Sequence, residues 1–271
     1  MKAHHSTVQT NKSHLLVTEK HPRGFCSNFL CLLGAIDHAK KTGQEIDVMK
    51  PGLFSLYLED EKCSFQSILE CKRITSYSCV YPSEVSPKDI GELHPRDLSQ
   101  KGIEILSALY TQEIIFSRFL RAALLKQLRR MKRPKRPFFS VHRRSTDHGM
   151  HGKIRPLSVF YDVIDRQFEE HEQFYLATDC KRDLEAMHSR YGNRCLYQKC
   201  FRSSSSDAIH FSSDRPSGSE MAVEVLVDIV IMAKSSHIIC TNSGVPLISR
   251  ILNPSVTVTD LTLEQYQNPF Q

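Results

Sequence analysis

The sequence lacks a hydrophobic stretch long enough to cross a membrane. Its longest apolar runs lie within residues 29–33 and 225–232, well short of the roughly 20 residues that a membrane-spanning helix needs. Residues 1–7 contain no apolar stretch that could act as a signal peptide. These absences argue against a transmembrane helix, and we expect a cytoplasmic location.

Several sequence signatures of metal and nucleotide sites are also missing. The nine Cys residues contain no C-x-x-C pair, so neither a structural zinc site nor a disulfide framework is predicted. We expect reduced thiols that are mostly small buried side chains. The chain has no G-x-x-x-x-G-K-[ST], G-x-G-x-x-G or D-x-D motif. The main support for P-loop, dinucleotide-binding and metal-dependent sugar-nucleotide sites is therefore absent.

Acidic residues are missing from one long segment, residues 118–136, in a chain whose net charge is +6. Such a segment can bind nucleic acid, an anionic membrane surface or a phosphorylated ligand. It can equally be the solvated face and end of a helix whose other face carries Ala122, Leu125 and Leu128. The sequence leaves both interpretations open.

The composition, with 40% hydrophobic and 24% charged residues, is typical of a folded globular protein. Strands are predicted at 138–142, 174–178, 195–197 and 237–241, alternating with helices at 157–168, 181–191, 219–233 and 245–252. This alternation predicts a parallel sheet with helices on both faces.

The first half of the chain gives a weaker pattern. Residues 14–50 predict a strand, a helix and a second strand, residues 51–95 predict irregular structure with short helices, and 99–131 a helix that is broken at most once. Pro134 and Pro137 cannot continue that helix. We therefore predict an N-terminal domain of residues 1–133 and a C-terminal domain of residues 134–271.

Polar residues follow the predicted strands, at the edge where open parallel sheets bind ligands. An arginine in the segment 143–148 can offer a planar fork to a phosphate, and the helix after Ser243 and Gly244 adds backbone donors. Together they predict a diphosphate site. The alternatives are that Arg143 and Arg144 pair with surface acids and that Asp179 caps the next helix.

Asp228 lies inside the apolar run 225–232, where an unpaired charge would be costly. If its side chain points to the strand ends, it can accept the N–H donors of a base or fix an arginine. It can also lie on the exposed stripe of an amphipathic helix.

Three motifs, at 141–147, 175–179 and 226–229 leading to 240–243, resemble in order and spacing the donor-site motifs of GDP-fucose-dependent α1,6-fucosyltransferases. The nodulation and core fucosyltransferases are the most similar types. The loop 23–29 and its following helix are loosely similar. The resemblance covers residues 138–252 well and 22–50 weakly, and 51–136 give it no support.

The resemblance implies an α/β, GT-B-like fold of two Rossmann-like domains whose parallel sheets face a cleft. Residues 1–133 would form the acceptor side, and 134–271 would bind the donor. The implied reaction is an inverting, metal-independent transfer of fucose from GDP-fucose to a hydroxyl of a glycan or glycoconjugate. No cofactor is implied, and nucleic acid is not an expected partner.

The donor-site residues implied by the resemblance are Gly24, His142, Arg144, Asp147, Asp179, Asp228, Ser243 and Gly244. Arg144 would be catalytic, because it would hold the β-phosphate and stabilise the departing GDP. His142 and Asp228 would contact guanine, while Ser243 and Gly244 would lie against the diphosphate. Asp147 and Asp179 would line the cleft.

The sequence departs from the family pattern at three positions. The second arginine of the first motif falls on Ser145, the second serine of the diphosphate turn on Gly244, and the acidic candidate base on Gly152. His148 and His151 are the nearest titratable groups to that last position. Two alternatives therefore stand beside the transferase: a nucleotide-binding protein that no longer transfers sugar, and a nucleic-acid-binding protein that uses residues 118–136.

Overall fold

The computed structural model describes residues 14–17, 24–48, 55–57, 69–71, 74–76, 99–130, 137–146, 155–204, 209, 212, 214–241 and 243–262. The first half contains β1 (His14–Val17), α1 (Phe25–Thr42), β2 (Glu45–Val48), η1 (Ser55–Tyr57), β3 (Leu69–Cys71), β4 (Ile74–Ser76), α3 (Gln100–Glu113), β5 (Ile114–Phe116) and α4 (Arg118–Arg130). The second half contains β6 (Phe139–Arg143), α5 (Leu157–Gln167), β7 (Phe174–Thr178), α6 (Lys181–Tyr191), η4 (Gly192–Arg194), β8 (Cys195–Leu196), α7 (Gly218–Met232), β9 (His237–Cys240), α8 (Gly244–Leu252) and β10 (Thr257–Asp260).

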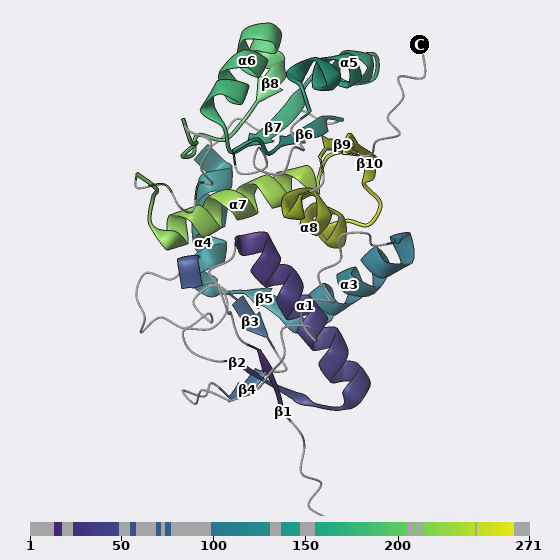
Figure 1. The fold of residues 1–271 in the computed structure, drawn as a ribbon, viewed down its shortest axis with the longest axis vertical. Coiled ribbons are helices and arrows are strands. Elements are labelled where there is room, and N and C mark those ends of the chain that lie inside the picture. The colour runs from purple at the N-terminus through teal and green to yellow at the C-terminus, as the bar shows by residue number, and fades with distance from the viewer. Residues whose placement is uncertain are drawn as a thin grey trace, which may run out of the picture.

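The second half is built on a five-stranded sheet in the order β10-β9-β6-β7-β8, with every pair of neighbours parallel. Helices α5 and α6 cover one face, and α7 and α8 cover the other (Figure 1). The predicted parallel sheet with helices on both faces is confirmed. The strand order changes direction between β6 and β9, so the carboxyl ends of these two strands form a topological switch point.

Alternation along β6 and β7 divides the side chains between the two faces. Val141 and Leu176 belong to the hydrophobic core shared with α5 and α6. Tyr175 and Ala177 belong to the core shared with α7 and α8. Since neighbouring strand residues point to opposite faces, Ser140, His142 and Arg144 are on the side of α7 and α8, and Arg143 is on the side of α5 and α6.

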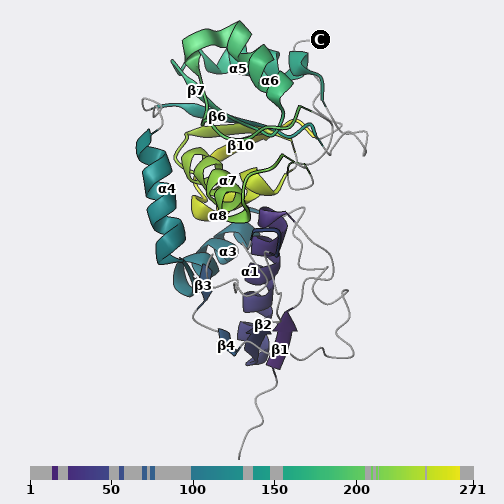
Figure 2. The same ribbon diagram turned by 90° about the vertical axis from the view of Figure 1, so that its left-hand side faces the viewer.

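The first half contains a three-stranded sheet, β1-β2-β4, and a two-stranded sheet, β3-β5. Helix α1 is apolar nearly all round between Phe29 and Ile36 and is buried between these strands and α8. It ends at Gly43, which adopts the left-handed conformation at φ 70° and donates its N–H to the Ala39 carbonyl. Helix α4 runs upright along one side of the molecule and reaches the second half (Figure 2).

The helix predicted over 99–131, with at most one break, is broken once, by β5, which pairs antiparallel with β3. Of the predicted apolar face of α4, Leu128 packs against the core, but the other two residues do not. Leu125 is 53% exposed and Ala122 is exposed too, whereas Leu120 and Leu124 are buried. The burial follows contacts with α7, which the local sequence does not contain.

Most other element predictions agree with the structure to within a residue or two. The strand β10 was missed, as were the short strands β3 and β4 in the segment that was expected to be irregular. The predicted boundary at 133–134 lies outside the described residues and stays a prediction. Six described cysteines are free thiols, four of them buried, as expected. Among the described helices, none combines the length and apolarity of a membrane span.

Candidate functional site

Two helices begin at the switch point of the five-stranded sheet. Helix α1 starts after Gly24, and α8 starts after Ser243. They are in direct contact, because a Cβ placed on Gly244 would lie only 2.4 Å from Cys26 Cβ. In Figure 1 the top of α1 meets α7 and α8. Each helix start carries partial positive charge and backbone N–H groups, so this meeting point favours an anion.

Arg144 adds a full positive charge beside the two helix starts. Burial raises the pKa of the Cys26 thiol to about 12, the positive charge of Arg144 opposes that rise, and the negative charge of Asp228 adds to it. Both charged groups therefore lie close enough to act on a residue in the first turn of α1. The first turn of α1 therefore lies against Gly244 and within electrostatic range of Arg144 and Asp228, three of the predicted residues.

Asp179 shapes the turn that carries Arg144. Its carboxylate accepts hydrogen bonds from the Ser145 N–H at 3.1 Å and the Thr146 hydroxyl at 2.6 Å, and Oδ2 lies 3.9 Å from Nε of Arg144. The residue that caps α6 is Cys180. The alternative that Asp179 caps this helix is therefore wrong, and its carboxylate holds the segment after β6 in place.

Arg143 has a different task on the opposite face of the sheet. Its Nε donates to Oδ2 of Asp183 at 2.7 Å, and Nη1 donates to the carbonyl oxygen of Arg155 at 2.5 Å. The guanidinium also lies 5.1 Å from the centre of the Phe160 ring. The Ser145 hydroxyl donates to the same Asp183 oxygen at 2.5 Å. Arg143 therefore pairs with a buried acid and does not replace the missing second arginine.

Asp228 is half-buried on α7 rather than on an exposed stripe, so that alternative is wrong. Its Oδ1 accepts hydrogen bonds from the Tyr175 hydroxyl at 2.6 Å and Nε2 of Gln198 at 2.7 Å. Burial raises the pKa of Asp228 to about 6, although both hydrogen bonds act to lower it. Two hydrogen-bond donors thus hold the Asp228 carboxylate in place beside the sheet.

Tyr175 and Gln198 were given no role from the sequence. Gln198 also donates to the Glu224 carbonyl at 2.7 Å, so it ties the segment after β8 to α7. Gln198 lies two residues after β8, so the expectation that ligands bind where parallel strands end could have identified it from the sequence. Tyr175 lies within the second motif, but its partner is 53 residues away in the chain.

The remaining predicted residues have simpler surroundings. His142 is buried near the end of β6. The Ser243 hydroxyl is buried and makes no hydrogen bond with the described residues. Gly24 leaves open space around its Cα. Asp147, His148, His151 and Gly152 lie outside the described residues. Within the described ranges, no group of three His, Cys, Asp or Glu residues could hold a metal ion.

No protein-family model and no curated protein sequence matches the chain. Solved structures of NodZ alpha-1,6-fucosyltransferase do match. The one co-crystallized with GDP has a TM-score of 0.60 at 13% identity and covers 97% of each chain. The one soaked with GDP-fucose has a TM-score of 0.58 at 13% identity and covers 93% of this chain and 96% of that one. Fucosyltransferase NodZ from Bradyrhizobium scores 0.59 at 13% identity over the same shares.

This likeness covers both halves of the chain and extends well beyond the three motifs. At such low identity it establishes the fold and leaves the activity to be argued from the site. The chain therefore has the α/β, GT-B-like fold of NodZ alpha-1,6-fucosyltransferase, as the motifs implied.

Proposed function

We propose that the protein is a glycosyltransferase that binds GDP-fucose and transfers fucose to a hydroxyl of a glycan or glycoconjugate. The observation that carries the proposal is the meeting of two helix starts and Arg144 at the switch point of the sheet. Support comes from the shared fold, since crystals of NodZ were soaked with GDP-fucose and co-crystallized with GDP.

The diphosphate would lie against the first turns of α1 and α8, with Arg144 on the β-phosphate. Negative charge grows on that phosphate as the bond to fucose breaks, so a guanidinium placed there stabilises the transition state more than the bound donor. In this proposal Arg144 and the helix dipoles supply the positive charge that other transferases take from a metal ion. The reaction would be inverting.

The guanine base of the donor would lie on the α7 side of β6, between His142 and Asp228. An ionised Asp228 carboxylate accepts two N–H donors, which guanine offers on one edge and adenine does not. Tyr175 and Gln198 would be positioning residues, because they fix the carboxylate without contacting the nucleotide. In the same proposal residues 134–271 bind the donor and residues 1–133 face the acceptor.

A nucleotide-binding protein without transferase activity is the second candidate. One observation favours it: Ser145 stands where the family has its second arginine, and its hydroxyl is engaged with Asp183. The site therefore has a single guanidinium in the described segment after β6.

Calorimetry without added metal, comparing GDP, UDP and ADP, tests the donor site. We expect selective GDP binding that weakens in Arg144→Ala and Asp228→Ala, whereas Arg166→Ala on α5 serves as a control that leaves binding unchanged. Binding of none of the three nucleotides would refute both candidates. GDP released from GDP-fucose in the presence of a glycan then separates the transferase from the inactive binder.

The catalytic assignment of Arg144 has its own test. If it stabilises the departing diphosphate, Arg144→Ala lowers turnover by on the order of a hundredfold or more. Arg144→Lys is expected to be poor as well, since a point charge cannot replace a planar fork. Full activity in a folded Arg144→Ala variant would remove the assignment.

A further inference from the structure

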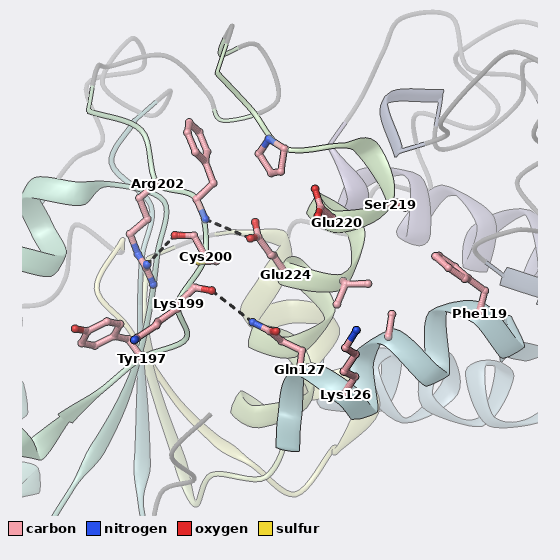
Figure 3. A pocket seen from close by; sticks show the side chains of 14 residues that line it. Phe119, Lys126, Gln127, Tyr197, Lys199, Cys200, Arg202, Ser219, Glu220 and Glu224 are labelled. Atoms are coloured by element: carbon pink, nitrogen blue, oxygen red, sulfur yellow. Dashed lines mark hydrogen bonds between the residues drawn. The ribbon is translucent and has the colours of Figure 1, made fainter. Parts of the chain in front are cut away.

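A hollow lies between α4, the first half of α7 and residues 197–202, which follow β8 (Figure 3). Its volume is about 700 Å³, in the usual range for small-molecule sites. None of the predicted donor-site residues lines it. Gln127 on α4 donates from Nε2 to the Lys199 carbonyl at 3.4 Å, which joins two of the walls.

The charged groups of this pocket leave a positive excess. Lys126, Lys199 and Arg202 line it together with two acids, Glu220 and Glu224. The Asp228 carboxylate behind this wall also acts on Glu224 and Arg202. The Glu220 carboxylate is engaged in the capping box that starts α7. Glu224 accepts the Phe201 N–H at 3.3 Å, and burial raises its pKa to about 7, so near neutral pH it is only partly ionised. An anionic ligand meets more attraction than repulsion here.

Aromatic rings line the same pocket. Phe119, Tyr197 and Phe201 contribute to its walls, and Phe119 is 60% exposed. The guanidinium of Arg202 lies 5.6 Å from the centre of the Tyr197 ring. Aromatic faces pack against the C–H face of sugar rings, and carboxylates accept hydrogen bonds from sugar hydroxyls.

The positive surface continues along the outer face of α4. Arg118, Arg121, Lys126 and Arg129 are exposed there, and residues 118–130 contain no acid. A long anionic chain could therefore extend from the pocket onto this helix. A nucleic acid is a poorer match, because its bases offer few hydroxyls to the two carboxylates in the pocket.

We propose that this pocket and the exposed face of α4 bind an anionic oligosaccharide whose sugar rings carry carboxylate or sulfate groups. The site would hold a part of the glycan that lies outside the donor cleft. The inference deepens the proposed function, on which it rests, by naming the class of glycan that the protein handles.

The test is calorimetry of the full chain with a heparin-derived hexasaccharide and with uncharged maltohexaose. We expect binding of the sulfated sugar only, weakening as salt screens the charges. The double variant Lys126→Ala/Lys199→Ala is expected to weaken it about tenfold, and Phe119→Ala several-fold. The matched control, Lys101→Ala/Lys234→Ala, removes the same charge from exposed positions outside the pocket and is expected to bind as the wild type does.

Equal weakening in the two double variants would overturn the proposal, as would equal binding of maltohexaose. Tighter binding of single-stranded DNA or phosphatidylserine vesicles through Lys126 and Lys199 would overturn it in favour of those partners. GDP binding is measured on each variant. If GDP fails to bind the wild type while the sulfated sugar still binds through the pocket, the donor assignment falls and the pocket assignment stands.

Discussion

Replacing Arg143 with alanine tests whether two adjacent arginines have separate tasks. The side chain of Arg143 is 7% exposed and that of its partner Asp183 is 10% exposed, with 2.7 Å between Nε and Oδ2. The alanine variant leaves Asp183 without this cation, although the Ser145 hydroxyl still donates to it. It also leaves the Arg155 carbonyl without its Nη1 donor. The damage is to the folded state rather than to a ligand contact.

The expected size of the effect follows from the burial of this pair. Removing one partner of a buried ion pair costs about 3–5 kcal/mol, which in a chain of this length corresponds to a fall in Tm of roughly 6–20 °C. Arg144 is 29% exposed and lies 3.9 Å from Asp179, so Arg144→Ala should cost about 0–1 kcal/mol. For GDP affinity we expect the opposite ranking: Arg144→Ala weakens GDP binding more than Arg143→Ala does.

Thermal and urea unfolding followed by circular dichroism, with GDP calorimetry on the same samples, measures both effects. The double variant Arg143→Met/Asp183→Leu removes both charges and should regain much of the lost stability, because no buried charge is left unpaired. An Arg143→Ala protein that melts within about 2 °C of the wild type would refute the reasoning. So would a double variant no more stable than the single one.

Three further predictions concern the donor site. Gly244→Ala should lower the free energy of unfolding by about 1–3 kcal/mol and weaken GDP binding, because the new Cβ would lie only 2.4 Å from Cys26 Cβ. In a double-mutant cycle Cys26→Gly should recover part of this loss. Strictly additive effects of the two substitutions would contradict the contact. Burial raises the pKa of Asp228 from 3.8 to about 6, so between these values the folded state binds more protons than the unfolded state and the wild type loses stability as pH rises. The Asp228→Asn variant should not show this loss of roughly 3 kcal/mol in the free energy of unfolding. If urea unfolding gave the same pH dependence for both proteins, the raised pKa of Asp228 would be excluded. Tyr175→Phe removes the 2.6 Å hydrogen bond to Asp228 and should reduce the preference for GDP over ADP several-fold in calorimetry, while an unchanged preference would mean that the hydroxyl positions nothing.

The sequence predicted those features that depend on local periodicity. Apolar strands alternating with helices predicted the parallel sheet with helices on both faces. Three motifs then implied the fold that the comparison with NodZ confirms. The site residues themselves stay predictions, although the first turn of α1 lies against Gly244 and within electrostatic range of Arg144 and Asp228.

The features that were missed depend on partners distant in the chain. Asp183 on α6 reads as an ordinary first-turn acid, and only the return of the chain beside β6 makes it the partner of Arg143. Leu125 and Leu120 are equally apolar, and contact with α7 decides which of them is buried. Strand β5 exists because β3 supplies its hydrogen-bond partners, which a three-residue segment cannot show by itself.

The hydrophobic core that α1, α3 and α4 share with α7 and α8 has a consequence for biosynthesis. A ribosome makes these three helices first, and the apolar faces that cover them emerge only after the chain has grown past residue 250. Leu32, Leu33 and Ile36 belong to this core and are fully buried in the finished protein. During that interval the nascent chain exposes apolar surface that can aggregate or engage chaperones. Emergence of α8, rather than synthesis of the first half, is the event that lets this core close.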